Sequence, residues 1–182
     1  MKPGWLKFAY LKHFSQPAKD RPIYRLIDGG TIRSITEFGL GAGVRTPRMI
    51  EVALRHHEPC QLRYTGFDLF ESRPAANAGM TLKQAHRQLT PTGIQFRLVP
   101  GEIIQGVVRT ANTLPNTDLI VIGGEIDHCA LEQVWLYFPR MLHEDSVVLL
   151  ESGNVRPEFQ KLSYQQVCEL ARRATAAIRR AA

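Results

Sequence analysis

Short strand-like runs alternate with helix-like segments along most of this chain. The runs lie at residues 33–38, 61–68, 92–99, 119–123 and 147–150. Each has the length of a β-strand. The run at 119–123 is almost entirely apolar, which is typical of a strand covered on both faces.

The segments between these runs carry signals for helix starts. Thr46-Pro47 predicts an N-cap followed by proline at the first position of a helix that reaches about His56. Thr81-x-x-Gln84 and Ser163-x-x-Gln166 are capping-box patterns that open two more helices. Apolar residues at helical spacing predict further helices at 103–111 and 128–142.

Repeated strand–helix alternation predicts an α/β fold with right-handed crossovers. We expect a Rossmann-like, three-layer α/β/α sandwich with a mostly parallel sheet of about five strands. Residues 1–182 are expected to form one domain, with a helical or irregular lead-in at 1–30, a core at 31–152 and a C-terminal helix region at 153–182. Such sheets bind ligands beyond the carboxyl ends of the strands, where the strand order reverses.

Composition narrows the class without identifying it. With 44% hydrophobic and 22% charged residues, the chain suits an ordinary globular domain. Its apolar runs are far shorter than a membrane span, and the three cysteines lack any Cys-x-x-Cys pair. We therefore expect a cytoplasmic protein without a membrane association. The net charge of +6 is scattered and lacks aromatic-basic interleaving, so nucleic acid is not the expected partner.

The stretch from Ile35 to Gly43 is the most informative part of the chain. It is a predicted strand with Glu37 near its end, followed by the glycines Gly39, Gly41 and Gly43. A loop without side chains lets a ligand lie against the backbone, and the next helix presents free N–H groups nearby. The Gly-x-Gly-x-Gly spacing differs from the Gly-x-Gly-x-x-Gly of dinucleotide folds, and Val44 lies where that fingerprint has glycine or alanine. An NAD-dependent oxidoreductase is therefore disfavoured.

Two later positions add to this pattern. Asp68 ends the second predicted strand, 25 residues after Gly43, where nucleotide-binding folds place a carboxylate for the ribose hydroxyls. Gly101-Glu102 follows the third strand and can border an adenine edge. Each feature alone also suits an ordinary turn or helix cap.

In order and spacing, these motifs resemble those of class I S-adenosylmethionine-dependent methyltransferases over roughly residues 30–152. The resemblance implies that Glu37 and the backbone of the three glycines hold the methionine end of S-adenosylmethionine. It implies that Asp68 binds the ribose and that Gly101 and Glu102 border the adenine. Residues 31–152 would then be the cofactor-binding core.

The segment Leu119–His128 looks like the Ile-Asp-Gly-Asp-His segment of small-molecule and sugar O-methyltransferases. Either Gly123 replaces the first carboxylate, or two residues are inserted before Asp127-His128. A hydroxyl acceptor must lose its proton, and His128 is the candidate base, with Asp127 and Glu125 beside it. These groups also suit Mg²⁺, although no metal site is assigned. Asp127 can equally be a helix cap.

The chain departs from the family after the fifth predicted strand, because the sequence shows no closing strand pair. The apolar strand 147–150 is then expected at a sheet edge, covered by residues 153–162, by the lead-in or by a second subunit in a homodimer. The missing pair usually shapes the acceptor pocket in this family.

Two functions follow from these expectations. The first is methyl transfer to a small-molecule acceptor at oxygen; the second is a non-catalytic cofactor-binding or interaction protein that retains the fold. A nucleic-acid methyltransferase is less favoured, because the Asn/Asp-Pro-Pro-aromatic motif is absent. The lead-in aromatics Trp5, Phe8, Tyr10 and Phe14 either close over the site or pack on the core.

Overall fold

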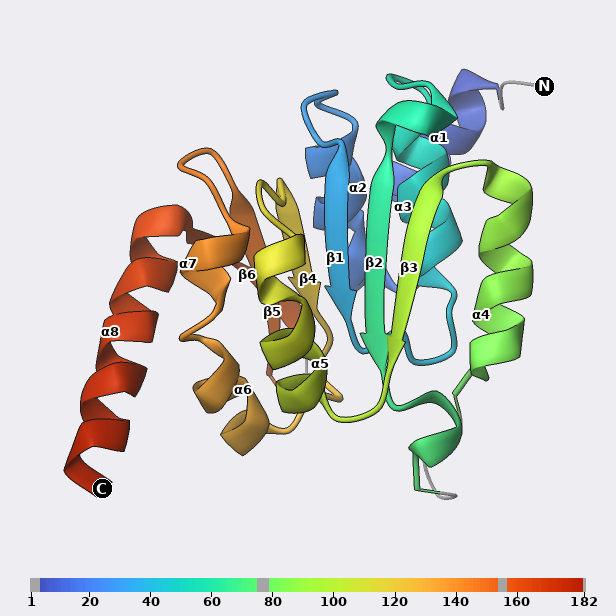
Figure 1. Cartoon of the computed structure of the whole chain (residues 1–182). Helices are drawn as coiled ribbons and strands as arrows, with labels where there is room; N and C mark the ends of the chain where they lie inside the picture. The colour runs from blue at the N-terminus through green and yellow to red at the C-terminus, as the bar shows by residue number, and fades with distance from the viewer. Residues whose placement is uncertain (1–3, 75–78, 154–156, 182) are drawn as a thin grey trace.

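The computed structural model describes residues 4–74, 79–153 and 157–181, without the side chain of Ala181. A six-stranded sheet with the order β3-β2-β1-β4-β5-β6 runs through its centre (Figure 1). The first five strands are parallel, and β6 is antiparallel to β5. Their bounds are β1 Ser34–Phe38, β2 Arg63–Asp68, β3 Gln95–Pro100, β4 Leu119–Ile122, β5 Val147–Ser152 and β6 Glu158–Ser163. The strand order reverses between β1 and β4, where ligands bind in such sheets.

Helices cover both faces of the sheet, so the predicted three-layer α/β/α architecture is confirmed (Figure 1). The helices are α1 Trp5–His13, α2 Arg21–Ile27, α3 Arg45–Ala53, α4 Leu82–Leu89, α5 Ile103–Thr110, α6 His128–Val134, α7 Phe138–Met141 and α8 Tyr164–Ala181. Buried apolar residues of α1, α2 and α3, together with Leu89 of α4, belong to one core cluster. Those of α5, α6, α7 and α8 belong to a second cluster on the other face.

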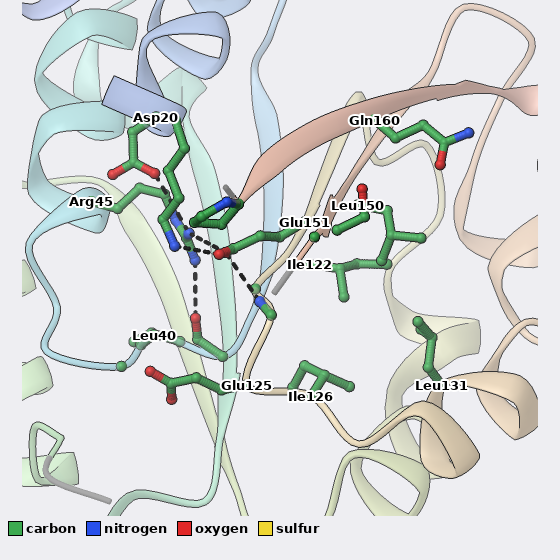
Figure 2. Close-up of a pocket in the computed structure, with 18 of the residues that line it drawn as sticks. Asp20, Leu40, Arg45, Ile122, Glu125, Ile126, Leu131, Leu150, Glu151 and Gln160 are labelled. Carbon is green, nitrogen blue, oxygen red and sulfur yellow. Dashed lines mark hydrogen bonds and ion pairs between the residues drawn. The ribbon is translucent and has the colours of Figure 1, made fainter. Parts of the chain in front are cut away.

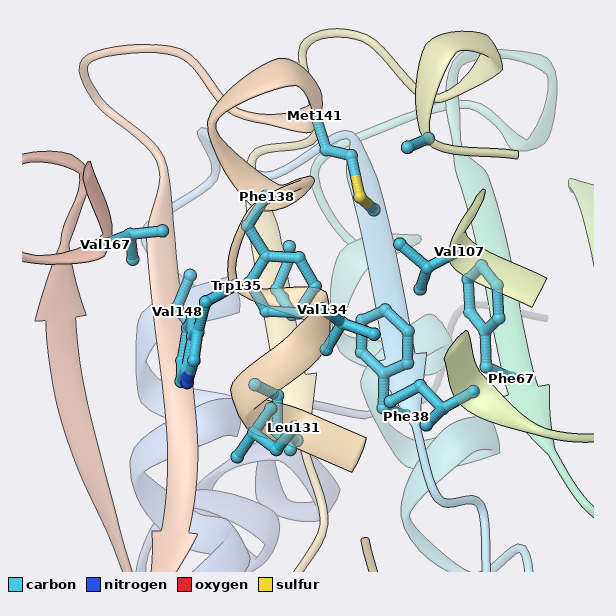
Figure 3. Close-up of a cluster of buried hydrophobic side chains, with 14 of the residues drawn as sticks. Phe38, Phe67, Val107, Leu131, Val134, Trp135, Phe138, Met141, Val148 and Val167 are labelled. Atoms are coloured by element: carbon cyan, nitrogen blue, oxygen red, sulfur yellow. The ribbon is translucent and has the colours of Figure 1, made fainter. Parts of the chain in front are cut away.

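Each central strand contributes to both cores by alternation. In β4, Leu119 and Val121 face the α1–α4 core, while Ile120 and Ile122 face the other. In the second core, the Phe38 ring stacks on Phe67 and Phe138, with centroids 4.6 and 5.5 Å apart (Figure 3). The sheet core therefore extends directly to the end of β1, where the glycine loop begins.

Strand β6 corrects the expectation of an exposed fifth strand. It pairs with β5 along its whole length, from Val147 opposite Ser163 to Ser152 opposite Glu158. Of the three covers predicted for residues 147–150, the segment at 153–162 is the one that pairs with them. The homodimer that we predicted through an exposed β5 has lost its basis, because that edge is already hydrogen-bonded.

Two helix predictions were wrong in detail. Thr46 is not the N-cap of α3, which begins at Arg45; its hydroxyl instead donates to the buried carboxylate of Glu37. The single helix expected over 128–142 is divided into α6 and α7. Pro139 has no N–H to donate to Trp135, four residues earlier, and its ring disfavours a continuous helix there.

The first helix of the lead-in packs against the core, and none of the four lead-in aromatic residues lines the large cavity described below. Phe8 is buried in the α1–α4 core, whereas Trp5, Tyr10 and Phe14 are exposed. The chain then continues through Gln16 to Asp20, which reaches the cavity described below. The core-packing alternative therefore applies to Phe8.

Candidate functional site

The glycine loop follows β1 and leads into α3. Gly39, Gly41 and Gly43 have φ angles of +78°, +56° and +69°. These values lie in the left-handed region, which only glycine adopts without strain. The loop thus keeps its backbone uncovered by side chains of its own at three alternate positions.

Asp68 reaches this loop from the end of β2. Its Oδ2 accepts hydrogen bonds from the backbone N–H groups of Leu40 at 2.6 Å and Gly41 at 3.2 Å. Its Oδ1 accepts from the N–H of Phe70 at 2.8 Å and pairs with Arg73. The structure therefore brings the glycine loop and Asp68 into direct contact.

Glu37 is fully buried beneath the loop. Its Oε1 accepts from Arg45 Nε at 2.8 Å, and its Oε2 accepts from the hydroxyls of Thr46 and Tyr64, both at 2.7 Å. Burial, followed by the charge of Glu37, raises the pKa of Tyr64 well above its usual range, so the phenol remains a donor. Both Glu37 oxygens are thus used by protein groups.

The loop after β4 covers part of the glycine loop. A Cβ at Gly41 would lie 2.8 Å from Glu125 Oε1, and one at Gly39 would lie 3.5 Å from Ile126 Cδ1. Glu125 is exposed over 60% of its side chain, and its Oε2 lies 3.9 Å from Arg73. Glu125 and Ile126 of the loop after β4 therefore lie against the backbone of the glycine loop.

A cavity of about 1320 Å³ opens at the carboxyl ends of β1, β4 and β5 (Figure 2). One part is bounded by the glycine loop from Gly39 to Ala42, and another by apolar residues of β4, β5, β6, α6 and α8. A single ligand pocket usually measures ~300–1,000 Å³, so this space exceeds what one small molecule needs.

A smaller cavity of about 110 Å³ lies beside the larger one. Asp68, Gly101 and Glu102 line it, and the N–H of Gly101 donates to the Asp68 carbonyl at 3.0 Å. Glu125 and Ile126 line both cavities. These two side chains therefore form the wall between the predicted nucleoside contacts and the large cavity.

The three candidate catalytic residues separate between these spaces. Glu125 and His128 line the large cavity, whereas Asp127 lines the small one. Asp127 is the N-cap of α6, with its Oδ2 accepting from the N–H of Ala130 at 2.9 Å. The helix-cap alternative for Asp127 thus matches its contacts. Within the described residues, no three His, Cys, Asp or Glu side chains are grouped to hold a metal ion.

A charged network that the sequence did not indicate lies at one end of the large cavity (Figure 2). Arg45 donates from Nη2 to the Gly39 carbonyl at 3.0 Å, and its Nη1 lies 3.8 Å from Asp20 Oδ1 and 3.9 Å from Glu151 Oε2. Lys19 pairs with Glu151, and Glu151 Oε2 accepts from the N–H of Gly124 at 3.1 Å. The network joins the lead-in, α3, β5 and the loop after β4.

Glu132 is another cavity residue that sequence reasoning missed. It lies one helical turn after His128, and this i, i+4 spacing was the available signal. For Asp20 and Glu151 the sequence held no local signal, because their elements meet only in the folded protein.

Solved structures resemble this chain, whereas sequence-based comparisons find no match. No family model matches the chain, and no curated protein matches it. Solved structures do match. The O-methyltransferase TomG from Streptomyces achromogenes, in complex with S-adenosylmethionine, has a TM-score of 0.55 at 14% identity, over 92% of this chain and 75% of that chain.

Two further matches are similar. A Plasmodium falciparum protein described as a protein-L-isoaspartate O-methyltransferase, in complex with S-adenosyl-L-homocysteine, has a TM-score of 0.55 at 12% identity. The alignment covers 82% of this chain and 66% of that one, so this chain spans just under two thirds of that relative. A Klebsiella pneumoniae protein described as an O-methyltransferase has a TM-score of 0.54 at 15% identity, over 94% of this chain and 78% of that chain.

The chain has the class I methyltransferase fold. This confirms the resemblance that the glycine loop and Asp68 predicted. On this methyltransferase fold, the loop after β1 and the end of β2 occupy neighbouring positions at the point where the strand order reverses. Among the helices that the structure describes, none is both long and apolar enough to cross a bilayer.

Proposed function

We propose that this protein is an S-adenosylmethionine-dependent methyltransferase that acts on a hydroxyl oxygen of a small molecule. The observation that carries this proposal is the contact of the Asp68 carboxylate with the N–H groups of Leu40 and Gly41, beside the large cavity. Nucleotide-binding folds of this topology receive a ribose where such a carboxylate meets a glycine loop.

The residues present fit the cofactor. The loop offers uncovered backbone at Gly39, Gly41 and Gly43 for the methionine end, and the small cavity offers Asp68 and Glu102 for the nucleoside. A ligand that spans both spaces requires the side chains of Glu125 and Ile126 to move aside and that of Met80 to leave Gly43. A ribose hydroxyl at Asp68 also requires Arg73 to release Oδ1. The exposed end of Glu125 moves at little cost, which supports this arrangement.

Glu37 receives a positioning role in this proposal. Its oxygens hold Arg45, Thr46 and Tyr64, and Arg45 in turn donates to the carbonyl of Gly39. Through this chain of contacts, a buried carboxylate fixes the loop that would receive the methionine end. A direct contact between Glu37 and the cofactor is not part of the proposal.

When bound, the cofactor supplies an electrophilic methyl group for an in-line displacement, in which alignment contributes most of the catalysis. His128, exposed on the large cavity at the start of α6, is the base that takes the acceptor's hydroxyl proton. Asp127 holds that end of α6 in place as its cap. Glu125 adds negative charge beside Gly41, where a cationic ligand would lie.

Calorimetry with S-adenosylhomocysteine tests the proposal. We expect a dissociation constant on the order of micromolar. In Asp68→Asn we expect it to rise at least about tenfold, because the amide loses the charge that accepts the hydroxyl protons. Asp145→Asn, in an exposed turn outside both cavities, is the matched control and should bind like the unmodified protein. Absence of binding to the unmodified, folded protein would refute the proposal.

The second candidate is a cofactor-binding protein without catalysis. It is favoured by the contacts of Glu125, Ile126 and Met80 with the glycine loop, which fill space near the backbone. Conversion of S-adenosylmethionine to S-adenosylhomocysteine in the presence of a hydroxylated acceptor separates the two. Binding without turnover over a broad acceptor panel would support the non-catalytic protein, and turnover that is lost in His128→Ala would exclude it.

A further inference from the structure

The large cavity has the opposite charge sign from the chain. The chain carries a formal net charge of +6. Apart from His128, the ionisable groups of the cavity lining are four carboxylates and two cations: Asp20, Glu125, Glu132, Glu151, Lys19 and Arg45. Four negative charges against two positive charges leave a formal charge of −2. The cavity therefore favours positively charged molecules on a protein that otherwise repels them.

The two cations of the lining are already paired. Arg45 binds the fully buried Glu37 and the carbonyl of Gly39. Lys19 forms an ion pair with Glu151. Neither Arg45 nor Lys19 is therefore available to bind a carboxylate or phosphate group of a ligand. An anionic acceptor would thus meet no uncommitted cation among the described residues of the cavity lining, and it would meet the exposed carboxylate of Glu132.

Three carboxylates have no cation within hydrogen-bond distance among the described residues; the ion pair of Asp20 Oδ1 with Arg45 Nη1 is 3.8 Å long. Asp20 is only 2% exposed, and its Oδ1 has no hydrogen-bond partner among the residues that the structure describes. Glu132 is exposed, and within the same described residues it forms no hydrogen bond or ion pair. Glu125 has only Arg73, at 3.9 Å. Because a buried acceptor without a donor is costly, Asp20 indicates that a ligand of this cavity carries N–H or O–H groups at the Arg45 end.

The wall next to Glu132 is apolar. Leu131, which adjoins it on α6, faces the same cavity as Leu150 of β5 and Leu170 of α8, and the latter two are half-buried (Figure 2 labels Leu131 and Leu150). Aliphatic side chains that converge on one cavity from three elements form a surface for an apolar ligand body. This end lies away from the charged network around Arg45.

We infer that the acceptor is an amphipathic amine. Its apolar, hydroxyl-bearing body lies against Leu131, Leu150 and Leu170, and its protonated amino group pairs with Glu132. This inference rests on the proposed function, since it names the acceptor class of the same site. Glu132 lies one turn from His128 on the same face of α6, so an amino group at Glu132 holds the acceptor beside the base.

Three probes with one hydroxylated ring and different tails test the inference: tyramine, N-acetyltyramine and 4-hydroxyphenylacetate. Binding is measured by calorimetry with S-adenosylhomocysteine at saturation. We expect tyramine to bind at least about fivefold more tightly than either of the others, and the preference to shrink at about 0.5 M salt. In Glu132→Gln the preference should fall below about twofold.

Glu144→Gln is the matched control, because Glu144 is exposed and lies outside both cavities. It should keep the full preference for tyramine. Equal or weaker binding of tyramine than of 4-hydroxyphenylacetate would overturn the inference, as would no binding of any probe or an unchanged preference in Glu132→Gln. Each of these outcomes, with S-adenosylhomocysteine still bound, leaves the proposed function intact. Loss of S-adenosylhomocysteine binding in the unmodified protein would instead refute the proposed function.

Discussion

Asp20 and Asp28 lie close in the sequence, but folding shifts their pKa values in opposite directions. Burial raises the pKa of Asp20 above its ordinary value of 3.8, and the charges of Arg45 and Lys19 offset only part of this rise. Burial acts in the same direction on Asp28, but hydrogen bonds from Lys12 and His56 and the charge of Arg55 together outweigh it and lower its pKa. Folding therefore disfavours the charged form of Asp20 and favours that of Asp28.

The two shifts predict opposite effects of pH on stability. The folded protein binds the Asp20 proton more tightly than the unfolded chain, so this group lowers the free energy of unfolding as pH rises from about 3.8 through the raised pKa. Asp28 contributes stability above its ordinary pKa, and this contribution is lost as pH falls through the lowered folded-state pKa.

We therefore predict that Asp20→Asn raises the free energy of unfolding at pH 7, while Asp28→Asn lowers it by about 1 kcal/mol. For both variants, the difference in free energy of unfolding from the unmodified protein should become smaller as the pH approaches about 3.5. Urea denaturation at a series of pH values measures them, with each variant serving as the control for the other. A loss of stability in Asp20→Asn at pH 7 would contradict the assignment of burial as the dominant influence on Asp20.

Among the elements, helix starts with a local signal were predictable, and β6 was not. Gln84 N–H donates to the Thr81 hydroxyl at 3.1 Å, as the capping-box pattern predicted for α4. Strand β6 contains two large apolar residues, Phe159 and Leu162, and they lie on opposite faces of the sheet. Such a strand has no one-sided alternation to detect, and its pairing with β5 decides its conformation.

For helix α6, we predict that Asp127→Ala lowers the free energy of unfolding by about 1 kcal/mol, because the N–H of Ala130 loses its cap. Asp127→Asn keeps an acceptor at that position and should cost only a few tenths of this. Chemical denaturation measures both. If Asp127 were itself the base, Asp127→Asn would abolish formation of S-adenosylhomocysteine while leaving stability unchanged, and the positioning role would be wrong.

At the scale of the whole molecule, the sheet separates two cores. Val148 packs in the α5–α8 core with its cross-strand partner Leu162, whereas the adjacent Leu149 packs in the α1–α4 core. Side chains on opposite faces of a sheet share few neighbours, even when they are consecutive in sequence.

This separation predicts a pattern of coupling in double variants. Leu162→Ala and Leu149→Ala should each cost about 2 kcal/mol or more. Combined with Val148→Ala, Leu162→Ala should deviate from additivity by more than about 0.5 kcal/mol, because the two residues are cross-strand partners in one core. For Val148→Ala combined with Leu149→Ala, the two losses in free energy of unfolding should be additive to within about 0.5 kcal/mol. Equal coupling in both pairs, measured by urea denaturation, would contradict the two-core description.

Part of the candidate site could be predicted from the sequence, and part of it could not. The glycine loop and Asp68 could be placed together because strand order in an α/β sheet follows from the strand–helix alternation. Arg45 contacts Glu37 beneath the loop, and Asp20 approaches it from the lead-in; both contacts depend on how distant elements pack. No pattern in the sequence encodes that packing locally.

Strand β6 and helix α8 bring Gln160, Leu162 and Leu170 to the large cavity, yet no described residue of either element lines the small cavity beside Asp68. Substitutions in these two elements can therefore change the space for the acceptor while leaving the proposed nucleoside site beside Asp68 unchanged. A laboratory that wishes to redirect this scaffold to new compounds should begin by diversifying residues 157–170.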